Sequence, residues 1–364
     1  MEAPEKDVPL FVDLDGTLVR TDTSTESAFR LIRRNIGYLF VLPFWLLRGK
    51  AHLKDRVARR VPLDATDLPY RDSILDFLRD QRSAGRKLTL ATAANHRHAQ
   101  QVADHLGLFE NVLASDRTHN LEGRHKLARM AELSAGGPFD YVADDLADMA
   151  IFRHARRAIV VAPPAAMRKA IAKLDNVERV FDPQARSVGN ALRTMRPARW
   201  LMNLLILLPN LLSGTHGTAW FEAAIGVFAF SLAASANYLF DDLLHLSERR
   251  RLPQKERGVV AAGGIGLQRA GIAIGVFWIL AFALALPLPG AFSLAMAGYV
   301  LLSLVAVQDW FRLPRPLTAM ALAVSRIAAG AALLTQPTSV WPWLISLAAG
   351  AGAEIPRRHK AGFI

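Results

Sequence analysis

The chain has 364 residues, of which 52% are hydrophobic, and a formal net charge of +12 at pH 7. It contains no cysteine, which excludes a disulfide framework, a zinc–thiolate site and a catalytic thiol. The positive charge does not indicate nucleic acid, because many Lys and Arg residues lie beside apolar segments, where anionic headgroups account for them. The polar start MEAPEKDVPL is not a signal peptide, so the first domain is expected in the cytoplasm.

The composition changes along the chain and predicts four regions. Residues 1–182 read as a soluble α/β domain, residues 183–198 as a basic linker, residues 199–352 as an all-α membrane domain, and residues 353–364 as an atypical basic tail. The α/β domain comes first, so its strand ends are the first place to look for a site.

The stretch VPLFVDLDGTLV predicts a buried strand that ends in two carboxylates, Asp13 and Asp15. Side chains two residues apart on a strand share a face, so both carboxylates can point at one substrate. Taken alone, the stretch is also compatible with a plain strand followed by a turn.

Three later segments repeat the pattern of a strand followed by a helix. One strand ends at Thr92, before a helix that Asn95 is expected to cap; Lys126 begins another helix; a further strand ends in Asp144, with Asp148 four residues beyond. This alternation predicts a doubly wound parallel sheet whose strand ends gather these side chains.

These residues resemble the four motifs of the haloacid dehalogenase (HAD) phosphohydrolase superfamily, in order, across roughly residues 8–162. The resemblance implies that Asp13 is the nucleophile, that Asp15 is the general acid and base, and that Thr92 and Lys126 hold the phosphoryl oxygens. It further implies a Mg²⁺ site formed by Asp13, Asp15, Asp144 and Asp148. Ala143 departs from the family, which usually has glycine there.

The segment from about residue 22 to 71 separates the first two motifs and reads as a helical cap, which in this family selects the substrate. Within it, IGYLFVLPFWLL (36–47) is apolar over twelve residues, which is too short to span a bilayer. It is expected to be either the buried core of the cap or a helix in the membrane interface. The interfacial alternative draws on four flanking basic residues, Arg33, Arg34, Arg48 and Lys50.

The second half contains six apolar runs, which predict six membrane-spanning helices. They lie near residues 200–214, 219–240, 266–286, 288–308, 317–336 and 338–352. The basic turns, 241–263 and 309–316, alternate with turns that carry no Lys or Arg, which predicts a multi-pass inner-membrane protein with the first domain on the cytoplasmic side. Arg326 lies inside the fifth run, where a charge needs a site or an internal partner.

This half resembles the UbiA superfamily of polyprenyl transferases, specifically bacterial members that carry an N-terminal HAD domain. One family motif survives partly in MRPARWLMN, and an acidic motif survives partly in NYLFDDLLHLSERRRLPQKER, where Asp242 alone keeps a family carboxylate position. The resemblance assigns the prenyl diphosphate to a degenerate set: Asp241, Asp242, His245, Lys255, Arg257, Arg196, Asn203 and Arg326.

Two further departures concern the end of the chain. A second acidic region reads VQDWFR, with Thr318 where the family has an aspartate, and the last residues, AGAGAEIPRRHKAGFI, do not resemble the family. We interpret this ending as a truncation, a frameshift or a short form.

Three functions follow from these patterns. The first is a transferase acting on a polyprenyl phosphate or diphosphate lipid, fused to a Mg²⁺-dependent phosphatase. The second is a membrane-tethered phosphatase acting on a phosphomonoester, with the apolar helices as anchor or lipid-binding surface. The third is a truncated relic with neither activity. None of them involves nucleic acid.

Overall fold

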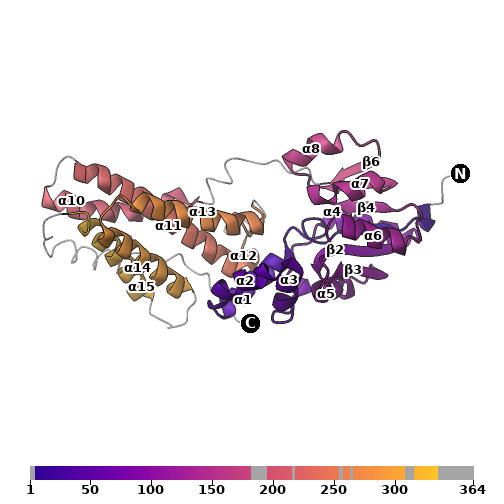
Figure 1. Cartoon of the computed structure of the whole chain (residues 1–364), viewed down its shortest axis with the longest axis horizontal. Coiled ribbons are helices and arrows are strands. Elements are labelled where there is room, and N and C mark those ends of the chain that lie inside the picture. The colour runs from indigo at the N-terminus through magenta and orange to yellow at the C-terminus, as the bar shows by residue number, and fades with distance from the viewer. Residues whose placement is uncertain are drawn as a thin grey trace. The chain divides into compact units, whose positions relative to one another are not determined.

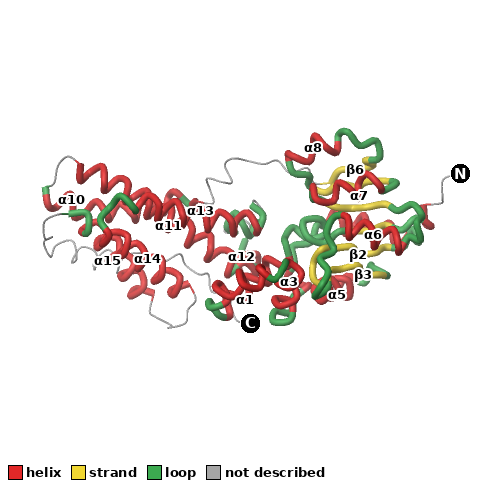
Figure 2. The backbone as a smooth tube through the Cα atoms, viewed as in Figure 1, coloured by secondary structure: helices red, strands yellow, loops and turns green. Residues whose placement is uncertain are grey.

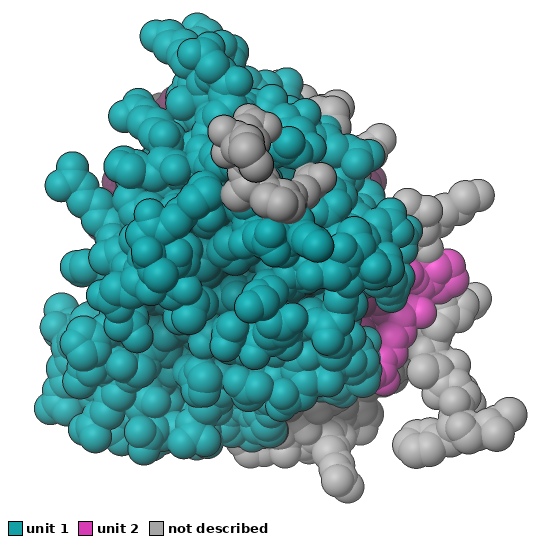
Figure 3. Space-filling model, turned by 90° about the vertical axis from the view of Figure 1, so that its right-hand side faces the viewer, with its two compact units in different colours: residues 1–187, 266–268 teal, residues 188–265, 269–364 magenta. Residues whose placement is uncertain are grey.

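The computed structural model describes residues 5–181, 195–214, 218–253, 257–262, 265–307 and 315–334. The chain divides into an α/β unit, residues 1–187 with 266–268, and a helical unit, residues 188–265 with 269–364 (Figure 3). Within the described residues, the strands lie in the first unit and the second unit is helical (Figures 1 and 2). Each unit has its own hydrophobic core.

The α/β unit is built on a six-stranded sheet with the order β3-β2-β1-β4-β5-β6, in which all neighbours pair in parallel. This confirms the predicted doubly wound sheet. The chain adds strands first on one side of β1 and then on the other, so its course reverses between β1 and β4. The strands are β1 (Leu10–Val12), β2 (Leu88–Asn95), β3 (Asn111–Ser115), β4 (Asp140–Ala143), β5 (Arg157–Val161) and β6 (Val177–Phe181).

Helices cover both faces of this sheet, because alternate residues of each strand point to opposite sides. Leu10 and Val12 of β1 face the core that contains α4 and α5, whereas Phe11 faces the core that contains α6, α7 and α8. The helices of this unit are α1 (Thr23–Arg34), α2 (Tyr38–Leu47), α3 (Lys50–Ala58), α4 (Asp72–Ser83), α5 (His96–Leu106), α6 (Arg124–Leu133), α7 (Met149–His154) and α8 (Ala165–Ile171), with short 3-10 turns η1 (Glu5–Asp7), η2 (Ala65–Asp67) and η3 (Leu146–Asp148).

The insertion between β1 and β2 is helical, as predicted, and forms α1, α2 and α3. These helices pack on a small cluster around Leu31, Val57 and Val61. Over residues 38–47, however, α2 has no buried residue, so the apolar segment is not the buried core of the cap.

The helical unit packs around Phe230, Phe292 and Tyr299. Gly330 lets the 3-10 segment η4 approach α15 closely, because a Cβ at that position would overlap the carbonyl of Ile206. The elements are η4 (Pro197–Leu207), α10 (Leu208–Ser213), α11 (Thr218–Leu244), α12 (Leu246–Arg250), α13 (Leu267–Ala285), α14 (Gly290–Val307) and α15 (Arg315–Ala331).

Among the described residues, two helices are long and apolar enough to cross a membrane, Trp220–Leu244 and Leu267–Ala285. The six predicted spans are therefore not confirmed. Residues 200–214 form the short elements η4 and α10, and α14 and α15 are apolar but shorter. Most of the predicted linker, the basic turn containing Arg312, the run at 338–352 and the tail at 353–364 lie outside the described residues.

Candidate active site

The predicted catalytic residues lie at the carboxyl ends of the central strands. Asp13 follows β1, Asp144 follows β4, Thr92 lies on β2, and Lys126 lies in the first turn of α6. Open α/β sheets hold ligands where the chain course reverses, and β1 and β4 flank that point here. The same edge of the sheet therefore carries two carboxylates and an ammonium group.

Lys126 is the centre of a buried polar network. Its Nζ donates to Asp13 Oδ1 at 2.9 Å, to Tyr141 Oη at 2.8 Å and to Asp148 Oδ2 at 3.2 Å. The Tyr141 hydroxyl in turn donates to Asp148 Oδ2 at 2.7 Å. One ammonium group thus links Asp13 to Asp148, and the network fixes the position of the Asp13 carboxylate.

A second set of contacts joins Asp13 to Asp144. The Thr17 hydroxyl lies 3.1 Å from Asp144 Oδ1 and 3.4 Å from Asp13 Oδ2, so it sits between the two carboxylates. Gly16 has φ +80°, and a Cβ there would overlap the Asp144 carboxylate. Glycine is therefore required for the loop after β1 to meet the end of β4.

Burial raises the pKa of Asp13 to about 6, with Lys126 opposing the rise and Asp148 adding to it. Burial, followed by repulsion from Asp13, raises the pKa of Asp144 to about 8, although Arg71 acts to lower it. Burial alone would lower the pKa of Lys126, but Asp13 and Asp148 raise it above its usual value. Lys126 therefore stays protonated, and its single positive charge does not balance the carboxyl groups of the site.

The remaining predicted residues have distinct surroundings. Asp15 accepts hydrogen bonds from the Thr23 backbone N–H at 2.8 Å and the Thr23 hydroxyl at 3.3 Å, and burial raises its pKa well above the usual value. Thr92 Oγ1 accepts from the Ala94 N–H at 3.0 Å. Asn95 caps α5 through a bond from the Arg97 N–H, which confirms the predicted cap.

The carboxylate pair suits a hard cation. Among the described residues, no group of three or more His, Asp and Glu side chains is arranged to hold a metal ion. Two oxygen-bearing side chains, Asp13 and Asp144, nevertheless converge through Thr17 at a buried edge where their charges are incompletely balanced. Mg²⁺ is commonly held by one or two carboxylates together with substrate phosphate, so this donor set fits it. Asp148 is directed to Lys126 and Tyr141 instead.

Sequence reasoning missed Thr17, Tyr141 and Arg71. Thr17 follows the DLDG motif, so its position was visible, but its bridging role depends on the turn at Gly16. Tyr141 lies on β4 and turns its hydroxyl to the buried network. Arg71, which is buried, donates through Nε and Nη2 to the Gly16 carbonyl at 3.2 and 3.0 Å and so holds the loop after β1.

The helical unit contains a second acidic cluster, in the last turns of α11. Arg196 donates to both oxygens of Asp242, at 2.7 and 2.6 Å, and Arg249 forms ion pairs with Asp241 and Asp242. His245 Nδ1 lies 3.0 Å from Asp241 Oδ1. Each carboxylate therefore faces at least one guanidinium group, and this arrangement leaves little negative charge for a metal ion.

The backbone also accommodates this pairing. Arg196 has φ +52°, a left-handed conformation that is uncommon for a residue with a side chain. A Cβ at Gly258 would come within 2.8 Å of Asp242 Oδ2 and 3.2 Å of the Arg196 guanidinium. Arg257 donates to the Leu252 carbonyl at the surface. The predicted ligand Lys255 lies outside the described residues.

Arg326 lies in a third polar cluster, buried within the helical unit. Its Nε donates to Asn203 Oδ1 at 2.9 Å and its Nη2 to Tyr299 Oη at 3.2 Å, and Asn203 donates to Ser231 Oγ at 2.9 Å. The buried arginine thus has internal partners, which is one of the two alternatives that the sequence predicted for it. The structure brings Arg326 and Asn203 together across 123 positions of sequence.

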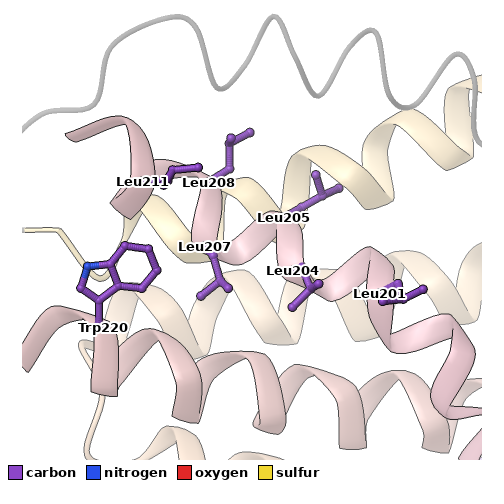
Figure 4. A pocket seen from close by; sticks show the side chains of 7 residues that line it. All are labelled: Leu201, Leu204, Leu205, Leu207, Leu208, Leu211 and Trp220. Carbon is purple, nitrogen blue, oxygen red and sulfur yellow. The ribbon is translucent and has the colours of Figure 1, made fainter. Parts of the chain in front are cut away.

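An apolar groove of about 410 Å³ lies on the same unit (Figure 4). Leu204 and Leu207 point toward the helix that carries Trp220, and the indole points back toward them. The lining residues are Leu201, Leu204, Leu205, Leu207, Leu208, Leu211 and Trp220. Among the described residues, the groove is lined by leucine side chains and the Trp220 indole, a lining that is suited to hydrocarbon.

Comparisons with known proteins agree with the arrangement at the sheet. Residues 10–153 match the family model of haloacid dehalogenase-like hydrolases. The α/β unit is therefore a haloacid dehalogenase-like hydrolase domain. Over its length the chain is 30% identical to the uncharacterized protein y4nM of Sinorhizobium fredii, with 98% of this chain and 70% of that protein covered. The chain belongs to the same family as y4nM.

Two solved structures are similar to part of the chain. A protein of unknown function from Bordetella pertussis is 17% identical, with a TM-score of 0.40, and 48% of this chain and 97% of that chain are covered. A HAD family hydrolase from Salmonella enterica is 12% identical, with a TM-score of 0.36 and coverage of 49% and 68%.

Proposed function

We propose that the α/β unit is a Mg²⁺-dependent phosphomonoester hydrolase in which Asp13 is the nucleophile. The observation that carries this proposal is the position of the Asp13 carboxylate, held by Lys126 on one side and joined through Thr17 to Asp144 on the other. A carboxylate nucleophile divides a difficult transfer into two easier steps.

In the first step, a carboxylate oxygen of Asp13 bonds to phosphorus as the bond to the ester oxygen breaks, and Asp15 gives its proton to the departing alcohol. In the second step, Asp15 takes a proton from water as the water oxygen replaces Asp13, which leaves inorganic phosphate. Burial raises the pKa of Asp15, which favours the protonated carboxyl that a general acid needs. Lys126 and Thr92 bind phosphoryl oxygens.

Asp13 and Asp144 are the residues that would hold Mg²⁺, and a bound cation would neutralise charge on the transferring phosphoryl group. The two candidate membrane helices anchor the protein to the cytoplasmic membrane, which suits a substrate whose phosphate lies near the bilayer. The substrate class is a phosphomonoester, with a lipid-borne phosphate as the favoured form.

The test is hydrolysis of a phosphomonoester panel by the full-length protein in detergent. We expect release of phosphate that requires Mg²⁺ and stops with EDTA. Asp13→Asn should reduce turnover by at least about 1,000-fold, because it removes the nucleophile. Asp145→Asn is the matched control, since Asp145 is an exposed neighbour of Asp144. Equal inactivity of the wild type and both variants with every ester would contradict the proposal.

A UbiA-type transferase acting on a polyprenyl phosphate or diphosphate is the second candidate, and we propose it for the helical unit only. The hydrogen bond between Arg326 and Asn203 favours it, since both residues belong to the UbiA-like set predicted from the sequence. The apolar groove also offers space for a prenyl chain. The pairing of Asp241 and Asp242 with arginines argues against a metal–diphosphate site.

The two candidates separate in one assay. Full-length protein in detergent is incubated with Mg²⁺, a radiolabelled polyprenyl diphosphate and a panel of acceptors. Transfer that survives Asp13→Asn and is lost in Arg326→Gln would support the second candidate. Phosphate release from the label without transfer would leave the phosphatase as the single activity.

A further inference from the structure

The helix α2 of the cap exposes an unbroken apolar stripe. Phe40 is 70% exposed, Phe44 67% and Leu47 84%, and Pro43 is also exposed. These positions follow the spacing i, i+3, i+4 and i+7, so they share one face of the helix.

The opposite face of α2 packs against the other helices of the cap. Tyr38, Leu42 and Trp45 pack on the cluster formed by α1 and α3, which contains Leu31 and Val57. The exposed stripe therefore adds nothing to the packing of the cap. Contiguous apolar surface of this kind, bordered by polar residues, marks a contact with another molecule or a membrane.

The charge around α2 identifies the occupant as an anionic surface. Between Arg30 and Arg60 the sequence holds nine Lys and Arg residues and a single acid, Asp55. Asp55 pairs with Arg59, and the guanidinium groups of Arg56 and Arg60 lie over the Trp45 ring, at 6.0 and 4.8 Å from its centroid. The cap thus combines an apolar stripe with an excess of positive charge.

That combination is the one found in helices that lie in the membrane interface, where the apolar face enters the acyl boundary and basic side chains meet the headgroups. A protein partner would suit the stripe but would not explain the charge, and a nucleic acid would suit the charge but not the stripe. The same chain also carries two helices long enough to cross a bilayer.

We propose that α2 lies in the interface of an anionic membrane, with Phe40, Pro43, Phe44 and Leu47 inserted among the lipids. The exposed basic residues on either side of α2, which are Arg33, Arg34, Arg48 and Lys50, then face the headgroups. This contact goes beyond the hydrolase activity, because it assigns the cap a lipid-binding surface. It also bears on access to the site, since Lys54 of α3 donates to the Ala93 carbonyl, next to Thr92, at 2.6 Å.

The absence of cysteine from the chain allows a direct test. Leu47→Cys in the full-length protein is labelled with an environment-sensitive fluorophore, and the protein is reconstituted into vesicles of equimolar phosphatidylcholine and phosphatidylglycerol. Ala84→Cys, at the exposed end of α4, is the matched control. Phe40→Cys provides a second site on the stripe. Phosphate release and circular dichroism check that each variant is folded.

We expect blue-shifted emission at Leu47→Cys and Phe40→Cys, and quenching by lipids spin-labelled near the headgroup more than by lipids labelled near the chain end. The control should show neither effect. Adding Arg48→Gln and Lys50→Gln should lower the ratio of inserted to free α2 by about fivefold per charge, because each basic residue near an anionic surface favours binding by about that factor.

Emission at Leu47→Cys equal to that of the control would overturn the proposal. A blue shift without quenching by any lipid would also overturn it, because it would show that protein covers the stripe. Both readouts are made without substrate, so an inactive phosphatase and a cap detached from the membrane give different results.

Discussion

The α/β unit pairs Asp13 and Asp148 with a single ammonium group and leaves Asp144 joined to Asp13 only through Thr17, whereas the helical unit places Asp241 and Asp242 between two guanidinium groups. The first arrangement retains negative charge that a cation can neutralise. In the second, the protein supplies the positive charge itself. Paired aspartates therefore do not define a metal site; the counter-ions that the fold brings to them decide it.

The largest expected effect comes from removing the counter-ion in each unit. Lys126→Met leaves buried carboxylates without a partner, and breaking a buried ion pair in this way costs about 3–5 kcal/mol. Hydrogen exchange of peptides covering β1 and β4 in the full-length protein measures the opening free energy of the unit. We expect that energy to fall by this amount.

Arg249→Met is the corresponding change in the helical unit, read on peptides covering α11. We expect a smaller loss, because Arg196 still holds Asp242 and His245 still contacts Asp241. A larger loss for Arg249→Met than for Lys126→Met would contradict the view that the α/β unit depends on one counter-ion and the helical unit on several.

The next largest effect is expected on kcat, when the glycine beside each carboxylate pair is replaced by alanine. Gly16→Ala places a Cβ against the Asp144 carboxylate at a φ of +80°, so it displaces the loop that carries Asp13. Small displacements of catalytic groups cost about 100-fold in rate, and we expect a fall in kcat of that order. Gly258→Ala crowds Asp242 in the same way and should leave phosphate release unchanged. Equal losses in both variants would mean that the two units are coupled.

The smallest expected effect is on the pH dependence of stability. Folding raises the pKa of Asp13 to about 6 and that of Asp144 to about 8, so both groups hold a proton more tightly in the folded chain. In EDTA they stabilise the fold below about pH 4 and lose that contribution as the pH rises through 6 and then 8. Thermal unfolding should show Mg²⁺ raising the Tm more at high pH than at low pH. A Mg²⁺ effect that is independent of pH would contradict this assignment.

Much of the α/β unit follows from local sequence. β1 and β4 are short, mostly apolar and each followed directly by an aspartate, so the parallel sheet and the approach of Asp13, Lys126 and Asp144 at its edge could be predicted. The contacts of Thr17 and Tyr141 could not, because they depend on how the loop at Gly16 turns. The contact of Asp148 with Lys126 could not be predicted either, because it depends on how distant segments pack, and Asp148 was therefore expected to support a metal.

In the helical unit, local sequence predicted the ends of the helices less well. The apolar run stops before Asp241, which predicted the end of a span, but α11 continues to Leu244. The carboxylates remain in the helix because Arg196, from a distant part of the sequence, pairs with Asp242. Hydropathy also does not show where η4 and α10 divide the first apolar run.

Binding of Mn²⁺, followed by electron paramagnetic resonance in the presence of phosphate, tests most directly where the metal chemistry resides. Full-length protein, Asp144→Asn, Asp145→Asn and Asp242→Asn are compared in the same detergent. We expect a single metal equivalent per chain that is lost in Asp144→Asn and retained in the other two variants. A metal signal that survives Asp144→Asn and disappears in Asp242→Asn would contradict a metal site in the α/β unit.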